Sequence, residues 1–189
     1  RPEARAGRDF LRERGFDALD WGKAASRLRD RLKFLHGRDP AWPDVSDAAM
    51  LAGLEDWLLP FLGLPRALSD ITPQRLHEGL AFLLASAGKG MAEADRKAPE
   101  HFTTPAGSHL PIRYEESAAC LAVRVQELFG LARHPAIMDG DYPLTLELLS
   151  PAHRPIQVTR DLPGFWKGSW AAVRSEMRGR YPRHPWPED

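Results

Sequence analysis

The stretch "PLTLELLSPAHRPIQVTRDLPGFWKGSW" (143–170) decides the fold class of this 189-residue chain. It overlaps "YPLTLELLSP" (142–151) and "RPIQVT" (154–159), which predict two strands that proline confines to edge or terminal positions. The continuation "DLPGFWKGSWAAVRSEMRGRY" (161–181) predicts a helix whose large apolar residues share a narrow arc: Trp166, Trp170, Val173 and Met177. Strands followed by a helix indicate an α+β domain, with a small mixed β-sheet packed with a C-terminal helix.

The sequence before residue 90 is helical in character, and about three helices are predicted there. "DWGKAASRLRDRLKFL" (20–35) has the apolar spacing of an amphipathic helix. "AAMLAGLEDWLLPFL" (48–62) and "TPQRLHEGLAFLLAS" (72–86) predict two more. The second helix is expected to begin at Ser46 or Asp47 and to be interrupted at Pro60. The third is expected to begin at Thr72, with Pro73 in its first turn, and to end at Gly88.

The segment "GKGMAEADRKAP" (88–99) is the predicted boundary between two halves, and "AGKGM" (87–91) within this region reads as a flexible linker. We therefore expect a helical subdomain over 1–90 and an α+β domain over 91–189.

The start of the second half predicts a hairpin, followed by a segment with two readings. "HFTTPAGSHLPIRY" (101–114) places a Pro-Ala-Gly-Ser turn between two β-prone runs. "SAACLAVRVQELFGL" (117–131) alternates like a strand at Leu121 and Val123, yet it also fits a helix that Gly130 ends. The length and the flanking residues favour the helix.

The composition limits the function classes. The 26 basic and 26 acidic residues balance, but residues 151–189 carry seven basic residues against four acidic ones. The lone Cys120 lies in an apolar run, so we expect a buried thiol and a reducing compartment, the cytoplasm. The sequence contains no run of 18 apolar residues and therefore predicts no membrane span. The chain begins with Arg1, and we expect it to be part of a longer protein.

Motifs for catalysis or metal binding are missing from the sequence. The phosphate-binding pattern G-x-x-x-x-G-K-[ST] is absent, and "AGKGM" lacks its spacing and its hydroxyl. The seven histidines show no paired metal-ligand spacing. Ser108 and His109 are adjacent on an extended chain and point to opposite sides, so they do not form a nucleophile and its base. We expect no catalytic residue, no metal and no cofactor in this chain.

A basic flank on the C-terminal helix is the strongest functional signal. With Trp166 at zero and about 100° per residue, Lys167, Arg174 and Arg178 cluster at about 80–120°. One interpretation is a core-packed helix whose long cationic side chains cover the side of its apolar face. The other adds contacts to RNA or DNA phosphates. The candidate nucleic-acid-binding residues are Arg154, Arg160, Lys167, Arg174, Arg178, Arg180 and Arg183.

The final stretch "RYPRHPWPED" (180–189) is rigid for a chain end. Its three prolines restrict the backbone, and Tyr181 and Trp186 offer large apolar faces. We expect this tail to pack against the domain as part of the fold.

Three segments together resemble a known family. They are "LAVRVQELFGL" (121–131), the stretch 143–170 quoted above, and "VRSEMRGRYPRHPWPED" (173–189). They resemble the C-terminal region of the HrpB family of bacterial DEAH-box ATP-dependent helicases. The match is strongest over about residues 100–189, and the preceding helices also resemble that family.

The resemblance implies that the catalytic domains of the parent helicase lie outside this segment. The family's ATPase and helicase motifs lie in two RecA-like domains that would precede Arg1, so ATP and Mg²⁺ would belong there and this segment would be a non-catalytic accessory domain. We expect it to assist RNA or DNA binding. The alternative is a regulatory module that docks on the helicase core or another protein through its acidic middle segment, with Glu115, Glu116, Asp139 and Asp141.

Overall fold

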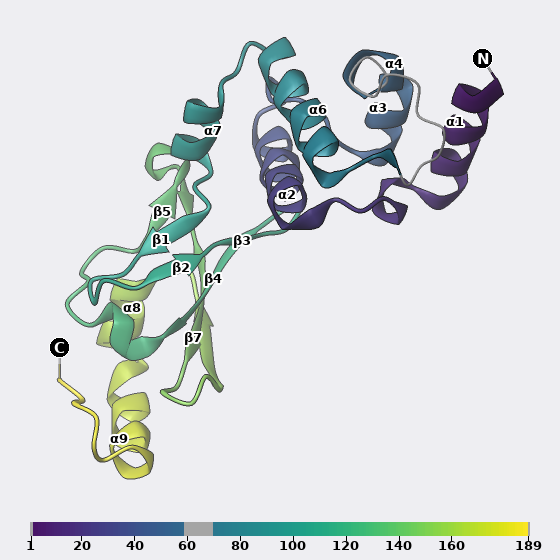
Figure 1. Cartoon of the computed structure of the whole chain (residues 1–189). Helices are drawn as coiled ribbons and strands as arrows, with labels where there is room; N and C mark the ends of the chain where they lie inside the picture. Colours follow the sequence, from purple (N-terminus) through teal and green to yellow (C-terminus); the bar gives the residue numbers. More distant parts are fainter. Residues whose placement is uncertain (1, 59–69, 189) are drawn as a thin grey trace. The chain divides into compact units, whose positions relative to one another are not determined.

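The computed structural model describes residues 2–58 and 70–188, with side chains from residue 7 onward (Figure 1). The chain divides into two compact units. The helical unit comprises residues up to 95 together with 115–117, and the mixed unit comprises 96–114 with 118–189. The domain bounds expected from the sequence, 1–90 and 91–189, stay a prediction.

Helices make up the first unit, as predicted. They are α1 (Pro2–Arg14), the 3-10 turn η1 (Phe16–Ala18), α2 (Gly22–Arg38), α3 (Asp47–Ala52), α4 (Leu54–Trp57), α6 (Pro73–Ser86) and α7 (Met91–Lys97), of which α7 runs past residue 95. The flexible linker predicted for 87–91 overlaps α7 only at Met91, and residues 92–97 of the predicted boundary region are helical. Good helix formers fill this segment and Ala94 is fully buried, so packing favours the helix after the Gly-Lys-Gly turn.

Local capping signals set two of the helix starts. The Ser46 hydroxyl accepts a hydrogen bond from the Ala49 backbone N–H, and the Thr72 hydroxyl accepts one from Arg75. Both caps were predicted, and the N-cap residue of α3 is Ser46 rather than Asp47. The predicted second helix is broken at Gly53 into α3 and α4, and its continuation beyond Leu58 lies outside the described residues.

The core of the helical unit includes a cation. Leu28, Leu32 and Leu35 of α2 are buried as the spacing predicted. Arg29, on the same helix, is only 4% exposed. Its guanidinium donates to the Val45 carbonyl at 3.1 Å and forms ion pairs with Asp47 at 2.6 Å and Asp17 at 3.3 Å. A buried charge with these partners organises the loop that precedes α3.

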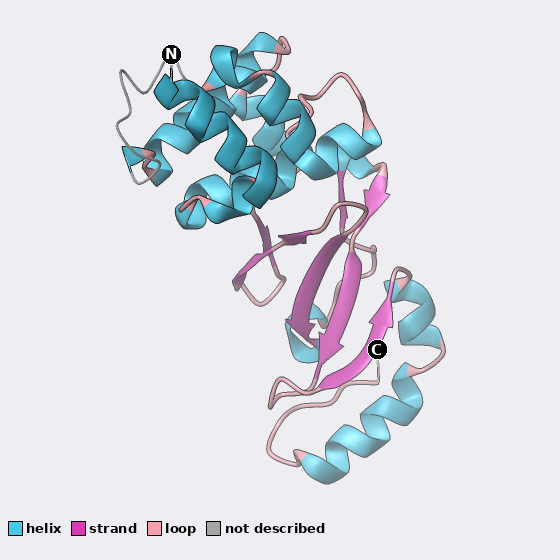
Figure 2. Cartoon of the chain, turned by 90° about the vertical axis from the view of Figure 1, so that its right-hand side faces the viewer, coloured by secondary structure: helices cyan, strands magenta, loops and turns pink. Residues whose placement is uncertain are grey.

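The mixed unit is built on short strands, coloured magenta in Figure 2. The predicted hairpin is confirmed, with β1 (His101–Thr103) antiparallel to β2 (His109–Pro111). A four-stranded sheet has the order β3 (Arg113–Tyr114), β4 (Ala119–Arg124), β7 (Thr145–Leu149), β8 (Pro155–Thr159). The β4/β7 pair is parallel and its neighbours are antiparallel, so the sheet is mixed. The remaining elements are η3 (Val125–Leu128), β5 (Ala136–Ile137), η4 (Met138–Gly140), β6 (Tyr142–Pro143), α8 (Leu162–Lys167) and α9 (Trp170–Arg180).

The helix favoured for 117–131 is wrong. Residues Ala119–Arg124 form strand β4, and the 3-10 turn η3 follows. β4 lies inside the sheet between β3 and β7, so sheet pairing on both edges overrides the helical spacing. The alternation of Leu121 and Val123 was the correct signal, since both are buried around the exposed Ala122. Cys120 is a buried free thiol, as expected.

A buried carboxylate holds the β1–β2 hairpin to η3. Glu127 accepts a hydrogen bond from the Thr104 hydroxyl at 2.8 Å and another from Arg124 at 3.2 Å. Burial acts to raise the pKa of this carboxyl, but hydrogen bonds from Ser108, Thr104 and Arg124 outweigh it and the pKa is lowered. Glu127 therefore stays ionised and fixes the turn of the hairpin.

Candidate nucleic-acid interface

An aromatic cluster positions the C-terminal segment of the mixed unit. The Trp170 ring is 1% exposed and lies 5.6 Å from Phe129, 6.1 Å from Phe165 and 6.2 Å from Trp186 between ring centroids. Trp166 meets Trp170 edge-on at 5.3 Å. Tilted and edge-on arrangements of this kind are favourable for aromatic rings. The cluster joins η3, α8, α9 and the tail into one packed body.

The tail after α9 is part of the fold, as predicted. Trp186 is 7% exposed, and its indole N–H donates to the Tyr181 carbonyl at 2.9 Å. Trp170 donates to the Pro187 carbonyl at 3.0 Å, and Arg174 Nε donates to the Trp186 carbonyl at 2.7 Å. The two hydrogen bonds from α9 side chains thus hold the tail backbone against the helix.

The single C-terminal helix expected over 161–181 is divided in two. Gly168 has φ −104° and ψ −89°, outside helical values, and it separates α8 from α9. Asp161 caps α8 by accepting from the Gly164 N–H, so α8 has its own start signal. Lys167 ends α8 while Arg174 lies on α9, so the continuous basic flank calculated for one helix does not exist.

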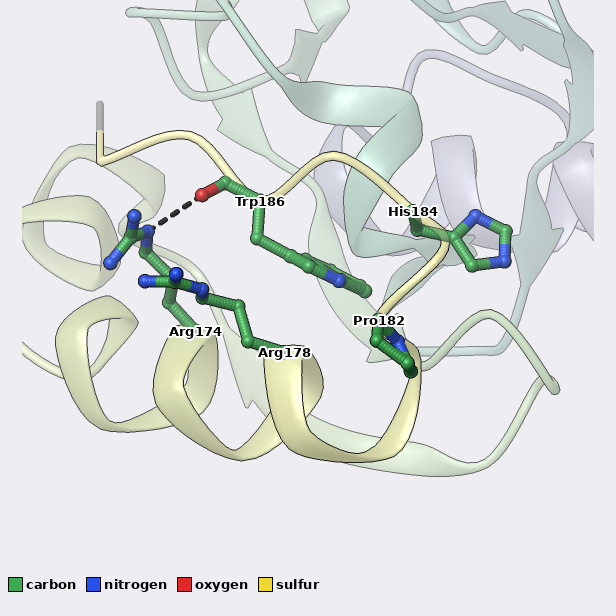
Figure 3. A pocket seen from close by; sticks show the side chains of 5 residues that line it. All are labelled: Arg174, Arg178, Pro182, His184 and Trp186. Atoms are coloured by element: carbon green, nitrogen blue, oxygen red, sulfur yellow. Dashed lines mark hydrogen bonds between the residues drawn. The ribbon is translucent and has the colours of Figure 1, made fainter.

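Two of the predicted cations line a common pocket. Arg174 and Arg178 lie one turn apart on α9, and with Pro182, His184 and Trp186 of the tail they enclose a cavity of about 420 Å³. Figure 3 shows Arg174 reaching from α9 to the Trp186 carbonyl of the tail, and the Arg178 side chain running along the helix toward Arg174. The tail residues of this pocket were not predicted as site residues. Their signal was the dense "YPRHPWP" pattern, which was interpreted only as packing.

The other five predicted cations do not line this pocket. Arg160 donates to the Pro143 carbonyl at 3.2 Å and stacks on the Tyr142 ring, and Arg180 pairs with Glu176 at 3.3 Å. The remaining three side chains are exposed and make no hydrogen bond or ion pair with any described residue: Arg154, Lys167 and Arg183.

The acidic residues predicted as a docking surface are partly used within the chain. Asp139 pairs with Lys97 at 2.8 Å and with Arg96 at 3.5 Å, and the Lys97 hydrogen bond is the main reason that the pKa of Asp139 is lowered. Arg113 donates two hydrogen bonds to Glu147, which lowers the pKa of that carboxyl too. Glu115, Glu116 and Asp141 are exposed. Asp139 is therefore a structural ion-pair residue, which weakens the acidic docking hypothesis.

Within residues 7–58 and 70–188, no three His, Cys, Asp or Glu side chains are placed to hold a metal ion. None of the helices described there combines the length and apolar character that crossing a bilayer requires.

Known proteins match this chain closely. The profile of the ATP-dependent helicase C-terminal family (HrpB_C) matches residues 57–189. The chain is 45% identical over 185 residues to the ATP-dependent RNA helicase HrpB of Escherichia coli (strain K12), covering 95% of this chain and 22% of that protein. It thus spans about a fifth of this relative's length.

Solved structures agree with the sequence match. The crystal structure of the E. coli DExH-box NTPase HrpB superposes with a TM-score of 0.85 at 43% identity, over 96% of this chain and 23% of that one. A crystal structure of the Escherichia coli DEAH/RHA helicase HrpB superposes with a TM-score of 0.72 at 41% identity, over 95% of this chain and 23% of that one. The α+β fold, the sequence match and the shared C-terminal segment lead to one conclusion: this chain belongs to the ATP-dependent helicase C-terminal family, and it corresponds to the C-terminal part of a HrpB helicase.

Proposed function

We propose that this chain is a non-catalytic accessory domain that helps an ATP-dependent helicase hold single-stranded nucleic acid, with RNA as the expected substrate. The observation that carries the proposal is the pocket where Arg174 and Arg178 face the tail. Arg178 has no carboxylate partner among the described residues. A cation that is not neutralised within the chain keeps its charge for a phosphate.

Two further exposed cations of the C-terminal segment extend the proposed surface. Arg183 lies between the pocket residues Pro182 and His184 in the sequence, and Lys167 ends α8. Exposed lysine and arginine side chains bind nucleic-acid backbone without reading sequence. The domain would therefore add affinity for the strand, and ATP, Mg²⁺ and the motor would be supplied by the remainder of the helicase, its expected partner.

Reversing one charge in the pocket tests this function. Arg178→Glu should weaken binding of a fluorescein-labelled single-stranded RNA by more than about tenfold at low salt, because it removes one phosphate contact and adds repulsion. Fluorescence anisotropy of the 189-residue chain measures the dissociation constant, with a DNA strand of equal length as a second ligand.

A matched reversal supplies the control. Lys23→Glu changes the net charge equally, at an exposed position of the helical unit, and should leave the affinity within about twofold. The same preparations should not hydrolyse ATP. Absence of RNA binding by the unmodified chain, or ATP turnover that scales with its concentration, would contradict the proposed function.

A further inference from the structure

The pocket between α9 and the tail is arranged before any ligand arrives. The Arg174 side chain is 22% exposed, and its Nε is engaged by the Trp186 carbonyl. That bond fixes the plane of the guanidinium and leaves its terminal nitrogens as the donors for another group. Fixing a long side chain in advance reduces the entropy lost on binding.

The two arginines give this pocket a marked positive potential. Arg178 adds a second guanidinium one turn along the same helix. Among the described tail residues, Glu188 forms a carboxylate contact, with its Oε1 4.0 Å from Arg174 and its side chain 86% exposed. A pair at this distance and exposure neutralises the arginine weakly, because solvent screens it.

We propose that this pocket is a phosphate-binding subsite, in which the Arg174 and Arg178 guanidinium groups donate to the oxygens of one phosphate group. Planar guanidinium forks match phosphate geometry and form charge-assisted hydrogen bonds. The open pocket has a volume of about 420 Å³, which is more than a bare phosphate requires and leaves room beside it for the rest of a nucleotide. His184 and Pro182 line the wall beside the arginines and limit which groups can follow the phosphate.

This inference deepens the proposed function, since it names the group that the pocket takes from a nucleic-acid strand. The same phosphate chemistry is also found in free phosphate and in a mononucleotide. Three probes separate the sources: inorganic phosphate, adenosine 5′-monophosphate and a short oligouridylate. Nuclear magnetic resonance of the 21.2 kDa chain can follow the Arg174 Nε–H signal and the Trp170 and Trp186 indole signals during each titration.

Arg178→Ala against Arg133→Ala is the decisive pair of variants. Both remove one exposed arginine from the mixed unit, but only Arg178 lines the pocket. Arg178→Ala should weaken the binding of the probes that shift the Arg174 signal by about tenfold, as expected for charge-assisted hydrogen bonds, whereas Arg133→Ala should change it by less than about twofold. Glu188→Gln should strengthen it about twofold, because the competing carboxylate is removed.

The outcomes separate this inference from the proposed function. If the oligouridylate binds but Arg178→Ala and Arg133→Ala weaken it equally, the subsite is wrong while general RNA binding stands. If phosphate or the mononucleotide shifts the Arg174 signal, the subsite stands even where the oligouridylate adds no affinity. If none of the three probes shifts it, the subsite is overturned.

Discussion

Replacing Trp170 by alanine should lower the free energy of unfolding of the mixed unit by about 3–5 kcal/mol, the range for truncating a buried aromatic side chain. Trp170 is 1% exposed, it contacts the rings of Phe129 just after η3, of Phe165 in α8 and of Trp186 in the tail, and its indole N–H donates to the Pro187 carbonyl. The substitution opens a cavity at the point where these elements meet. Urea unfolding followed by circular dichroism measures the loss.

Two further substitutions make the Trp170 result specific. Trp170→Phe keeps an aromatic ring but loses the hydrogen bond to Pro187, so its cost should be clearly smaller. Val158→Ala removes an apolar side chain that is 63% exposed on the edge strand β8, and should cost less than about 0.5 kcal/mol. If Trp170→Ala were no more damaging than Val158→Ala, the tail and α9 would not be packed as described.

Gly79→Ala should destabilise the helical unit by about 2 kcal/mol, although alanine has a higher helix propensity than glycine. Alanine within α6 gains about 1 kcal/mol over glycine from propensity. A Cβ at this position, however, would lie 2.6 Å from the Trp57 ring and 2.9 Å from the Trp57 carbonyl oxygen. Overpacking against a ring and a backbone atom costs about 3 kcal/mol, the upper end of its usual range. This cost exceeds the gain from helix propensity, so the substitution should lower stability.

Gly179→Ala is the matched control for this clash. Gly179 also lies in a helix, α9, and a Cβ there would meet no atom within 4 Å. It should leave stability unchanged or raise it by up to about 1 kcal/mol. Thermal unfolding of both variants measures the contrast, and stabilisation by Gly79→Ala would show that α6 and Trp57 do not approach as closely as described.

Local signals in the sequence predicted a large part of the fold. The caps at Ser46 and Thr72 and the turn of the β1–β2 hairpin depend on residues within a few positions of each other, and each is found where it was expected. The features that were mispredicted or not predicted depend on long-range packing. Strand β4 exists because β3 and β7 pair with it, and Arg29 is buried because Asp17 and Asp47 reach it from other segments.

The candidate site was only partly accessible to sequence reasoning. Composition identified Arg174 and Arg178, but a helical wheel could not anticipate the break at Gly168 that places Lys167 on another helix. The pocket also needs the tail to fold back over α9, and Trp170 and Arg174 hold it there by hydrogen bonds across 17 and 12 residues. A docked tail was predicted from its aromatic residues and prolines, whereas the cavity that it closes was not.

The salt dependence of RNA binding tests the central claim most directly, namely that phosphate contacts by cations of the C-terminal segment are how this domain binds a strand. Each phosphate contact on a single strand contributes about −0.7 to the slope of log K against log salt concentration. We predict a slope of about −2 or steeper for the unmodified chain, and a slope smaller in magnitude by about 0.7 for Arg178→Ala. Binding that salt does not weaken, or an unchanged slope in Arg178→Ala, would contradict the account.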